Sequence, residues 1–354
     1  MQEKSQEKFG AFKPARLSDW EVAAQVELKG ADPWEKLKHN VLGCTILPFY
    51  TQTEDHPEPP LLHIPEKIFL GPRTWYNCPR VVVESAKKSN GEALEHLRNG
   101  ADGIFFELDG EKDFQTLLKD IDERYCSLNF LVKKNAQPIA EALQHFLSEN
   151  KTTHSHLPGA FFGNRLFSNP FPAGFHCSGF QVVPNLSIAE EIAACFVPFA
   201  GMEVADFQRI AGQVAFSVAL GTDFFLSVAK IRALRVVWHK FLTEKKINEN
   251  STLFIHAHSL PWTDESFQPH GNILKSTTSA MAAILGGCDA LTLEPEEANQ
   301  SMMVRVARNV SNILREESYL SKVADPLAGS YYIETITRQL GDAAWKSIAL
   351  HLRP

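Results

Sequence analysis

The chain has 354 residues, of which 44% are hydrophobic and 22% charged, and its formal net charge at pH 7 is −7. A mildly acidic chain with no basic run argues against nucleic acid or an anionic membrane as a main partner. The length is too great for one small domain, but it fits an α/β barrel of about 250 residues with an extension.

The six cysteines are scattered and form no CxxC pair. Disulfide frameworks belong to short secreted chains, so we expect reduced, mostly buried thiols. The first ten residues are polar and unlike a signal peptide. No run approaches the ~18 apolar residues that span a membrane. These features predict a cytoplasmic protein.

Residues 1–70 are expected to form an N-terminal helical and extended arm. Residues 1–16 look loosely structured, and a helix is expected to begin at Ser18, with Glu21 completing a capping box. The proline-rich stretch at 51–66 is typical of an extended linker. The aromatic residues of the arm include Trp20, Trp34, Phe49 and Tyr50, and they predict a surface that binds a partner or packs on the chain's own barrel.

From about residue 70 short apolar runs alternate with amphipathic stretches. Runs of four to seven residues that are rich in Phe, Val and Ile predict strands. These are Val81–Glu84, Gly103–Leu108, Leu128–Val132, Gly159–Phe162, Cys177–Val183, Leu253–His258 and Ala290–Glu294. Helices are expected near 90–99, 112–124, 137–149, 187–197, 222–244, 272–286 and 296–318, the fourth with a capping box of Ser187 and Glu190.

This alternation indicates parallel strands joined by crossover helices. An open doubly wound sheet and a (β/α)8 barrel both fit it, and we favour the barrel, over residues 71–354. No glycine-rich phosphate fingerprint follows an early strand, so the pattern gives no support to a dinucleotide-binding fold.

Four segments resemble one known family in the same order. They are GTDFFLSVAKIRALRVVW at 221–238, AMAAILGG at 280–287, RVARNVSNILREE at 305–317 and DPLAGSYYIE at 325–334. Together they resemble the second half of the methylmalonyl-CoA mutase barrel. The opening, with LKGAD at 28–32, resembles the small subunit of that enzyme rather than the large one.

The resemblance implies a (β/α)8 barrel and a link to the interconversion of methylmalonyl-CoA and succinyl-CoA, an isomerisation that uses adenosylcobalamin. In the family CoA threads the barrel axis, and cobalamin sits on a separate C-terminal domain. The cobalt-ligating D-x-H-x-x-G segment has no counterpart in this sequence. We therefore expect the chain alone to bind no cobalamin, with adenosylcobalamin held in a heterodimer by a large catalytic subunit.

Several positions that match the family's active-site motifs carry other residues. The family's G-Y-H corresponds to Gly179, Phe180 and Gln181, and Phe162 stands where the T-I-Q-N-D segment has its glutamine. Arg80 falls at the tyrosine of W-x-x-R-Q-Y. Because groups that act as one constellation fail together, these replacements predict a catalytically silent chain.

The connection after Phe162 is also short. Only 18 residues, 163–180, lie between Phe162 and Gln181, too few for the family's helix. We therefore expect that helix to be missing or shortened. The substrate-binding arginine that the family carries there is expected to be absent with it.

A family segment that contacts the corrin survives in part as HAHSLPW at 256–262. The resemblance makes His256, His258 and Trp262 vestigial corrin-facing positions. An alternative follows from the spacing, since histidines at i and i+2 on a strand point to one side and could share a zinc ion. Further ligands would be needed, so we expect hydrogen-bonded imidazoles and no metal.

The basic residues Lys230, Arg232 and Arg235 lie within the first family segment. On a helix, 232 and 235 share a face. They are expected to be salt-bridged within the barrel, or else to contact another subunit.

Three functions remain as hypotheses. The first is a silent, small-subunit-like component that supports a large catalytic mutase subunit. The second is an active acyl-CoA mutase barrel that uses a separate cobalamin protein. The third is a metal-dependent barrel enzyme that uses His256 and His258. Weak binding of CoA esters is compatible with the first, because the barrel axis could stay open.

Overall fold

The computed structural model describes residues 15–41, 43–51, 74–110, 112–149, 157–166, 171, 174–182, 187–247, 251–260 and 270–352. The proline-rich stretch expected to be a linker, the first residues of the arm and Trp262 lie outside these ranges. The N-terminal part contains α2 (Leu17–Glu27), α3 (Pro33–Lys36) and an antiparallel hairpin of β1 (His39–Val41) and β2 (Cys44–Ile46).

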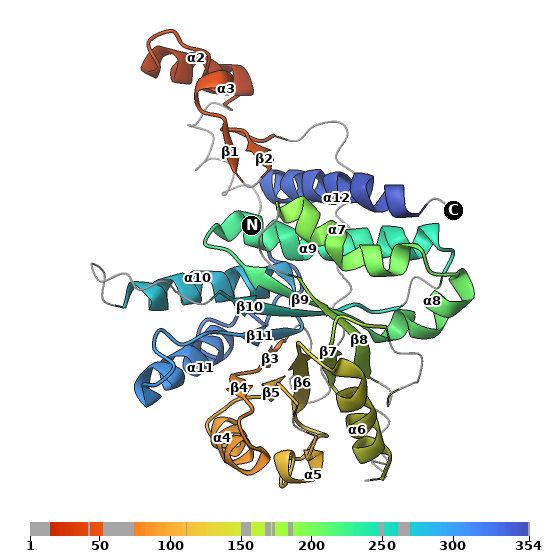
Figure 1. The fold of residues 1–354 in the computed structure, drawn as a ribbon. Coiled ribbons are helices and arrows are strands. Elements are labelled where there is room, and N and C mark those ends of the chain that lie inside the picture. The colour runs from red at the N-terminus through yellow and green to blue at the C-terminus, as the bar shows by residue number, and fades with distance from the viewer. Residues whose placement is uncertain are drawn as a thin grey trace, which may run out of the picture.

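The rest of the described chain forms one parallel sheet with surrounding helices (Figure 1). Its strands are β3 (Tyr76–Asn77), β4 (Arg80–Val82), β5 (Gly103–Leu108), β6 (Ser127–Val132), β7 (Gly159–Phe162), β8 (Phe175–Gln181), β9 (Val214–Leu220), β10 (Phe254–Ser259) and β11 (Ala290–Thr292). Its helices are α4 (Ala86–Arg98), α5 (Phe114–Leu117), α6 (Ala136–Glu149), α7 (Ile188–Ala200), α8 (Val204–Ile210), α9 (Phe224–Glu244), α10 (Gly271–Gly286), α11 (Ser301–Glu316) and α12 (Tyr331–His351), with a 3₁₀ turn at Ala211–Gln213.

The sheet closes on itself through its first strand. β3 and β4 are successive segments of that strand, and Pro79 between them has no N–H to donate to a ladder. β3 pairs with β11, while β4 pairs with β5. Every strand therefore has a partner on both sides of the ring, which gives eight strand positions. The expected (β/α)8 barrel is confirmed, and the open doubly wound sheet is wrong.

The connection from β7 to β8 differs from the other strand connections. Its described residues, 163–166, 171 and 174, form no helix. In its place Asn164, at a φ of 51°, accepts a 2.8 Å hydrogen bond from the Gln181 backbone N–H. The ends of the two strands are thus tied directly, and the described part of the connection agrees with the expected missing or shortened helix.

Most of the expected strands and helices are present, with several differences. β9 and α8 were not anticipated, and the helix expected at 112–124 is reduced to the single turn of α5. Asp120 at a φ of 61° follows that turn and prevents its continuation. The first helix begins at Leu17, and the box partner is Asp19, which accepts from the Arg16 backbone. The Ser187–Glu190 capping box is confirmed.

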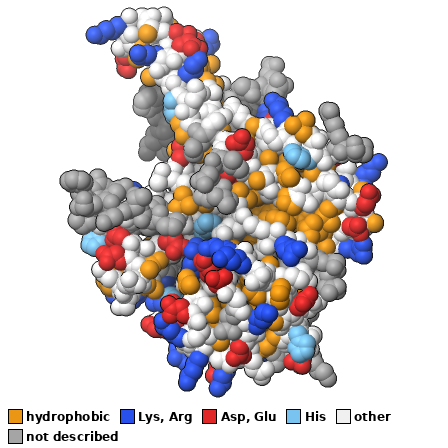
Figure 2. Space-filling model, viewed as in Figure 1, with side chains coloured by type: hydrophobic (Ala, Val, Ile, Leu, Met, Phe, Trp, Pro, Cys, Tyr) orange, Lys and Arg blue, Asp and Glu red, His pale blue; other side chains and the backbone are white. Residues whose placement is uncertain are grey.

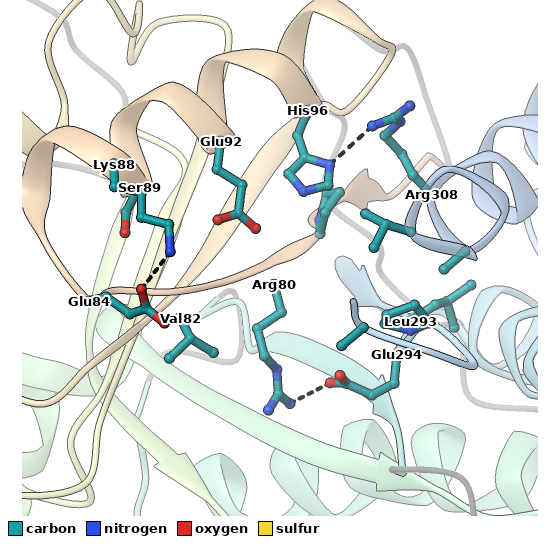
Figure 3. A pocket seen from close by; sticks show the side chains of 15 residues that line it. Arg80, Val82, Glu84, Lys88, Ser89, Glu92, His96, Leu293, Glu294 and Arg308 are labelled. Atoms are coloured by element: carbon teal, nitrogen blue, oxygen red, sulfur yellow. Dashed lines mark hydrogen bonds and ion pairs between the residues drawn. The ribbon is translucent and has the colours of Figure 1, made fainter. Parts of the chain in front are cut away.

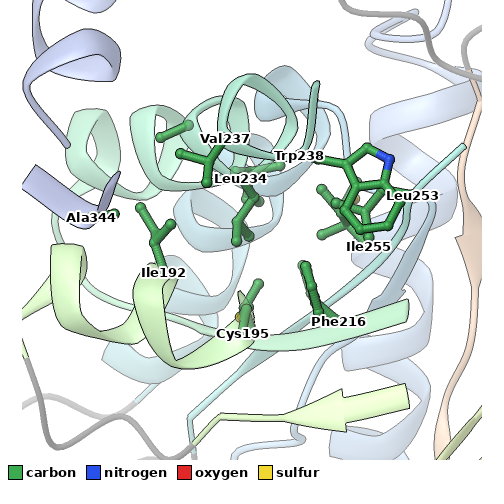
Figure 4. Close-up of a cluster of buried hydrophobic side chains, with 14 of the residues drawn as sticks. Ile192, Cys195, Phe216, Leu234, Val237, Trp238, Leu253, Ile255 and Ala344 are labelled. Carbon is green, nitrogen blue, oxygen red and sulfur yellow. The ribbon is translucent and has the colours of Figure 1, made fainter. Parts of the chain in front are cut away.

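The largest hydrophobic cluster lies between the strands β8–β10 and the helices α7, α9 and α12, and Figure 4 shows part of it. Phe216 and Ile255 project outward from the sheet there and meet Trp238 of α9. The α9 helix is buried over most of its length. This explains why the second half of the chain, where the family motifs lie, forms a single packed unit.

The basic residues of α9 form buried ion pairs. Arg232 is bonded to Asp325 and Glu334, each at 2.6 Å, and Lys230 pairs with Glu191 of α7. Arg235 similarly contacts Asp289, at 2.8 Å. The three basic side chains are all at least nine-tenths buried. The prediction of a salt-bridged barrel helix is confirmed, and these residues do not form a basic surface.

The N-terminal helices project away from the barrel (Figure 1). α2 buries none of its residues. The hairpin that follows is different, because Cys44 and Ile46 belong to the main core cluster and β2 contacts α12. The hairpin is therefore integrated with the barrel, and so is Tyr50 just after it, whose ring lies 4.9 Å from that of Tyr332 in α12.

The surface carries both signs of charge. On the face shown in Figure 2, acidic and basic side chains lie side by side near the centre, with hydrophobic side chains gathered beside them. None of the helices in the described ranges is both long enough and apolar enough to cross a bilayer.

Candidate functional site at the mouth of the barrel

The interior of the barrel is filled by side chains. Phe105 of β5 stacks on His256 of β10, with ring centroids 4.3 Å apart and an interplanar angle of 12°. Phe162 of β7 lies against the same imidazole at 5.7 Å. Below them the following residues form one buried cluster with Phe105 and Phe162: Tyr76, Cys78, Leu131, Ala160, Ala215, Phe254 and Ala290. Among the described residues these side chains pack against one another across the axis.

His256 is fully buried and both of its ring nitrogens are hydrogen-bonded. Thr292 donates its hydroxyl proton to the Cys78 carbonyl at 2.6 Å, so it accepts from His256 Nε2, at 2.8 Å. Nδ1 then accepts from the Ser217 hydroxyl, also at 2.8 Å. Burial, with a contribution from the nearby His258 and Arg80, holds the pKa of His256 well below its usual range. This imidazole is neutral and structural.

His258 lies two residues further along β10 on the same side, with its ring 5.8 Å from that of His256. Its Nδ1 is 3.3 Å from the Ser259 carbonyl and therefore carries the proton. Its Nε2 is buried and has no hydrogen-bond partner among the described residues. Burial first, and then the charge of Arg80, lower the pKa of His258 to about 4. It is thus a neutral imidazole at physiological pH.

Charged side chains close the barrel above this aromatic layer. Arg80 of β4 lies 3.1 Å from Glu107 of β5 and 2.7 Å from Glu294, just after β11. Lys133, following β6, pairs with the other oxygen of Glu107. Burial raises the pKa of Glu294, although Arg80 counteracts this. Arg80 also approaches the face of Phe105, at 5.9 Å.

The structure brings together four of the residues selected from the sequence, namely Arg80, Phe162, His256 and His258. Gln181 ends β8 half-buried, and its backbone bonds with Asn164. Phe180 does not belong to this group. It faces α7, where it packs edge-on against Phe199 at 5.2 Å. Trp262 lies outside the described residues.

Five residues of this site were not anticipated: Phe105, Glu107, Ser217, Thr292 and Glu294. Glu107 and Glu294 each occur at the end of an apolar strand run, which is where barrel sites are built, so their position was a usable signal. Ser217 belongs to β9, a strand that was itself missed. Phe105 reads as an ordinary core residue, and nothing in the sequence distinguishes it.

The chemistry available at this mouth is limited. Both nitrogens of His256 are engaged, and Arg80 is shared between two carboxylates. Within the described ranges no three His, Cys, Asp or Glu side chains are placed to hold a metal ion. Of the two imidazoles, only His258 keeps a ring nitrogen without a partner among the described residues.

Comparison with known proteins gives this geometry its context. Residues 179–350 match the methylmalonyl-CoA mutase family model. The methylmalonyl-CoA mutase small subunit of Porphyromonas gingivalis is 27% identical over 98% of this chain and 64% of its own length. The methylmalonyl-CoA mutase of Cereibacter sphaeroides is 38% identical over 42% of this chain and 21% of its own length. The chain therefore spans less than two thirds of these relatives.

A second small subunit, from Streptomyces virginiae, is 34% identical over 39% of this chain and 23% of its own length. Both small subunits carry the same family name as the model that matches the C-terminal half. The likeness to the first extends through nearly the whole chain, including the N-terminal part, and the closed barrel agrees with it. The chain belongs to the methylmalonyl-CoA mutase family.

Proposed function

We propose that this chain is a small-subunit-like component of an adenosylcobalamin-dependent methylmalonyl-CoA mutase, silent by itself and paired as a heterodimer with a large catalytic subunit. The observation that carries the proposal is the filled barrel axis. Phe105, Phe162 and His256 are in mutual contact, so their rings lie across the path that an acyl-CoA would take along that axis.

The charges at the mouth support the same conclusion. A dicarboxylate head group needs a cation that is free to bind it, and bidentate arginine is the usual choice. Arg80 is the cation nearest the aromatic layer, and it is already paired with Glu107 and Glu294. Binding a substrate there would require an ion pair to be broken in a largely buried setting, which is costly.

The N-terminal helices are the proposed docking element. Trp20 stacks on Phe49 and meets Trp34 edge-on, each with centroids 5.1 Å apart. This aromatic cluster stiffens an arm whose outer helix exposes Val22 by 63% and Val26 by 73%. A rigid aromatic support beneath exposed aliphatic side chains is typical of a surface that binds another protein.

The alternative functions are less well supported. An active mutase barrel using a separate cobalamin protein would need the axis to open. A metal-dependent enzyme would need His256 as a ligand, but hydroxyl groups occupy both of its nitrogens. All six cysteines are buried and none forms a disulfide, which fits a reducing compartment, so a cytoplasmic location forms part of the proposal.

The test is a mutase assay with methylmalonyl-CoA and adenosylcobalamin, using this chain alone, a large mutase subunit alone, and the two together. We expect no turnover by the chain alone and co-elution of the two proteins on size exclusion. Turnover by the isolated chain would disprove its silence, and failure of the two proteins to associate would disprove the subunit role.

A further inference from the structure

A cavity of about 240 Å³ lies outside the sheet, between α4 and α11 and beside the seam where β4 and β11 end. We call it the seam cavity, and Figure 3 shows its lining. It is separate from the filled axis. It does share Arg80 and Glu294 with the barrel mouth, and its outer wall is made by residues of the two helices.

Arg308 of α11 is the unusual residue of the seam cavity. It is only 7% exposed, yet no carboxylate lies within ion-pair distance of it in the described ranges. Its Nη1 is 3.2 Å from His96 Nδ1, and its Nε has no hydrogen-bond partner there. A buried guanidinium without a counter-ion is unfavourable. An anion bound in the cavity would remove that penalty.

His96 of α4 supplies a second donor. A guanidinium can only donate, so His96 Nδ1 must accept, and the imidazole proton resides on Nε2. Burial, followed by the charge of Arg308, lowers the pKa of His96 to about 4, which keeps the ring neutral. Arg308 and His96 both line the cavity, and each keeps N–H donors that their mutual contact does not use.

The other charges of the cavity are mostly compensated. Glu84 pairs with Lys88 at 2.6 Å, and Glu294 pairs with Arg80 at 2.7 Å. Glu92 has no ion-pair partner in the part of the chain described here, and burial raises its pKa. The charge of Glu95 acts on Arg308, but no ion pair joins them in the described ranges, so this guanidinium can attract one further negative charge. A phosphate dianion would instead be repelled by Glu92 and Glu294.

The remaining wall is aliphatic. Leu293 follows β11, Val304 and Ala307 come from α11, and Val82 from β4. A ligand that fills the cavity therefore needs a charged end and a short apolar body. We propose that the seam cavity binds a short-chain aliphatic monocarboxylate, with the carboxylate on Arg308 and His96 and the aliphatic chain against Leu293 and Val304.

The test is a titration of the full chain with butyrate, followed by calorimetry and by chemical shifts of the labelled carboxylate. We expect saturable binding to the unaltered protein and at least a tenfold loss of affinity in Arg308→Met. Lys87→Met is the matched control, because it removes a cation of α4 that is exposed and does not line the cavity. It should bind butyrate unchanged.

A second variant leaves Arg308 in place. Val304→Phe should fill the cavity, and we expect it to abolish binding while circular dichroism and the melting temperature confirm a folded chain. Inorganic phosphate and butylamine serve as competing probes and should bind at least tenfold more weakly than butyrate. The proposal fails if butyrate does not saturate, if Arg308→Met binds it normally, or if phosphate binds equally well.

Discussion

At the scale of single residues, the buried histidines show how environment decides chemistry. His256 and His258 look like a ligand pair in the sequence. In the structure both ring nitrogens of His256 are hydrogen-bonded to hydroxyl groups. The pKa of His258 is lowered by burial and by the nearby charge of Arg80. A position can thus match a functional motif and still act only in packing. That outcome depended on Ser217 and Thr292, which no local pattern connects to the histidines.

The pKa of His258 leads to a prediction about stability. The folded pKa of about 4 lies below the ordinary value of 6.5. Between these values the unfolded chain binds more protons, so stability falls as pH drops. Protonation of His258 should lower the free energy of unfolding by on the order of 3 kcal/mol. His258→Phe should therefore show a shallower decline in the free energy of unfolding from pH 6.5 to 4, measured by urea denaturation.

The control is His145→Asn, since the side chain of His145 is 71% exposed. Its stability should follow the same pH profile as the unaltered chain. A profile for His258→Phe that also coincides with that of the unaltered chain would show that His258 is not held neutral by burial.

A second residue-scale prediction concerns Gln181, which stands where the family has a histidine. Gln181→His should produce no mutase activity in the isolated chain and no change in the assembled enzyme. One donor cannot act while the barrel axis remains filled and the companion groups are missing. The measurement is the conversion of methylmalonyl-CoA with and without the large subunit. Any turnover gained by the variant chain alone would contradict its silence.

At the scale of elements, small side chains explain why β9 escaped prediction. Ala215 of β9 lines the lumen opposite bulky partners such as Phe105 and Phe162. Those aromatic rings fill the axis from other strands, so β9 can carry Ala and Ser on its inner face. The alternation of large apolar and other side chains along β9 is therefore weak. The reason lies in side chains of other strands, which a short stretch of sequence does not include.

The long helix α9 supports a quantitative prediction. Arg232 is fully buried and joins this helix to Asp325 and to Glu334 of α12. Removing the Arg232 cation leaves both carboxylates without their ion-pair partner. Arg232→Met should therefore lower the free energy of unfolding by about 3–5 kcal/mol. Arg209→Met is the control. That arginine forms an exposed pair with Asp206, and its loss should cost at most about 1 kcal/mol. Equal denaturation midpoints for the two variants would contradict this assignment.

At the scale of the whole molecule, the strand–helix alternation and the family segments were enough to predict a closed barrel with a short β7–β8 connection. The seam cavity could not be predicted. His96 and Arg308 are 212 positions apart in the sequence, and they meet only because the first and last strands pair. The filled axis was missed for a similar reason, since its aromatic rings come from different strands. Closure of the ring creates both features.

The projecting arm gives the last prediction. Deleting residues 1–50 would also remove Cys44 and Ile46 from the core, so the informative truncation ends at residue 37, before the hairpin. We expect that truncation to weaken assembly with the large subunit while the melting temperature stays close to that of the full chain. The reason is that α2 buries nothing on its own barrel, whereas its exposed Val22 and Val26 would be buried by a partner.

Val22→Glu combined with Val26→Glu should reproduce the defect without any deletion, because a charge placed in an apolar contact must be desolvated. Leu350→Glu is the matched control, being 67% exposed on α12, far along the chain from the arm. Co-purification with a tagged large subunit measures the effect, and at least a tenfold weaker recovery is expected for the double variant alone. Equal recovery of the truncated, doubly substituted and unaltered chains would show that the arm has no part in docking, and the subunit contact would then have to lie on the barrel itself.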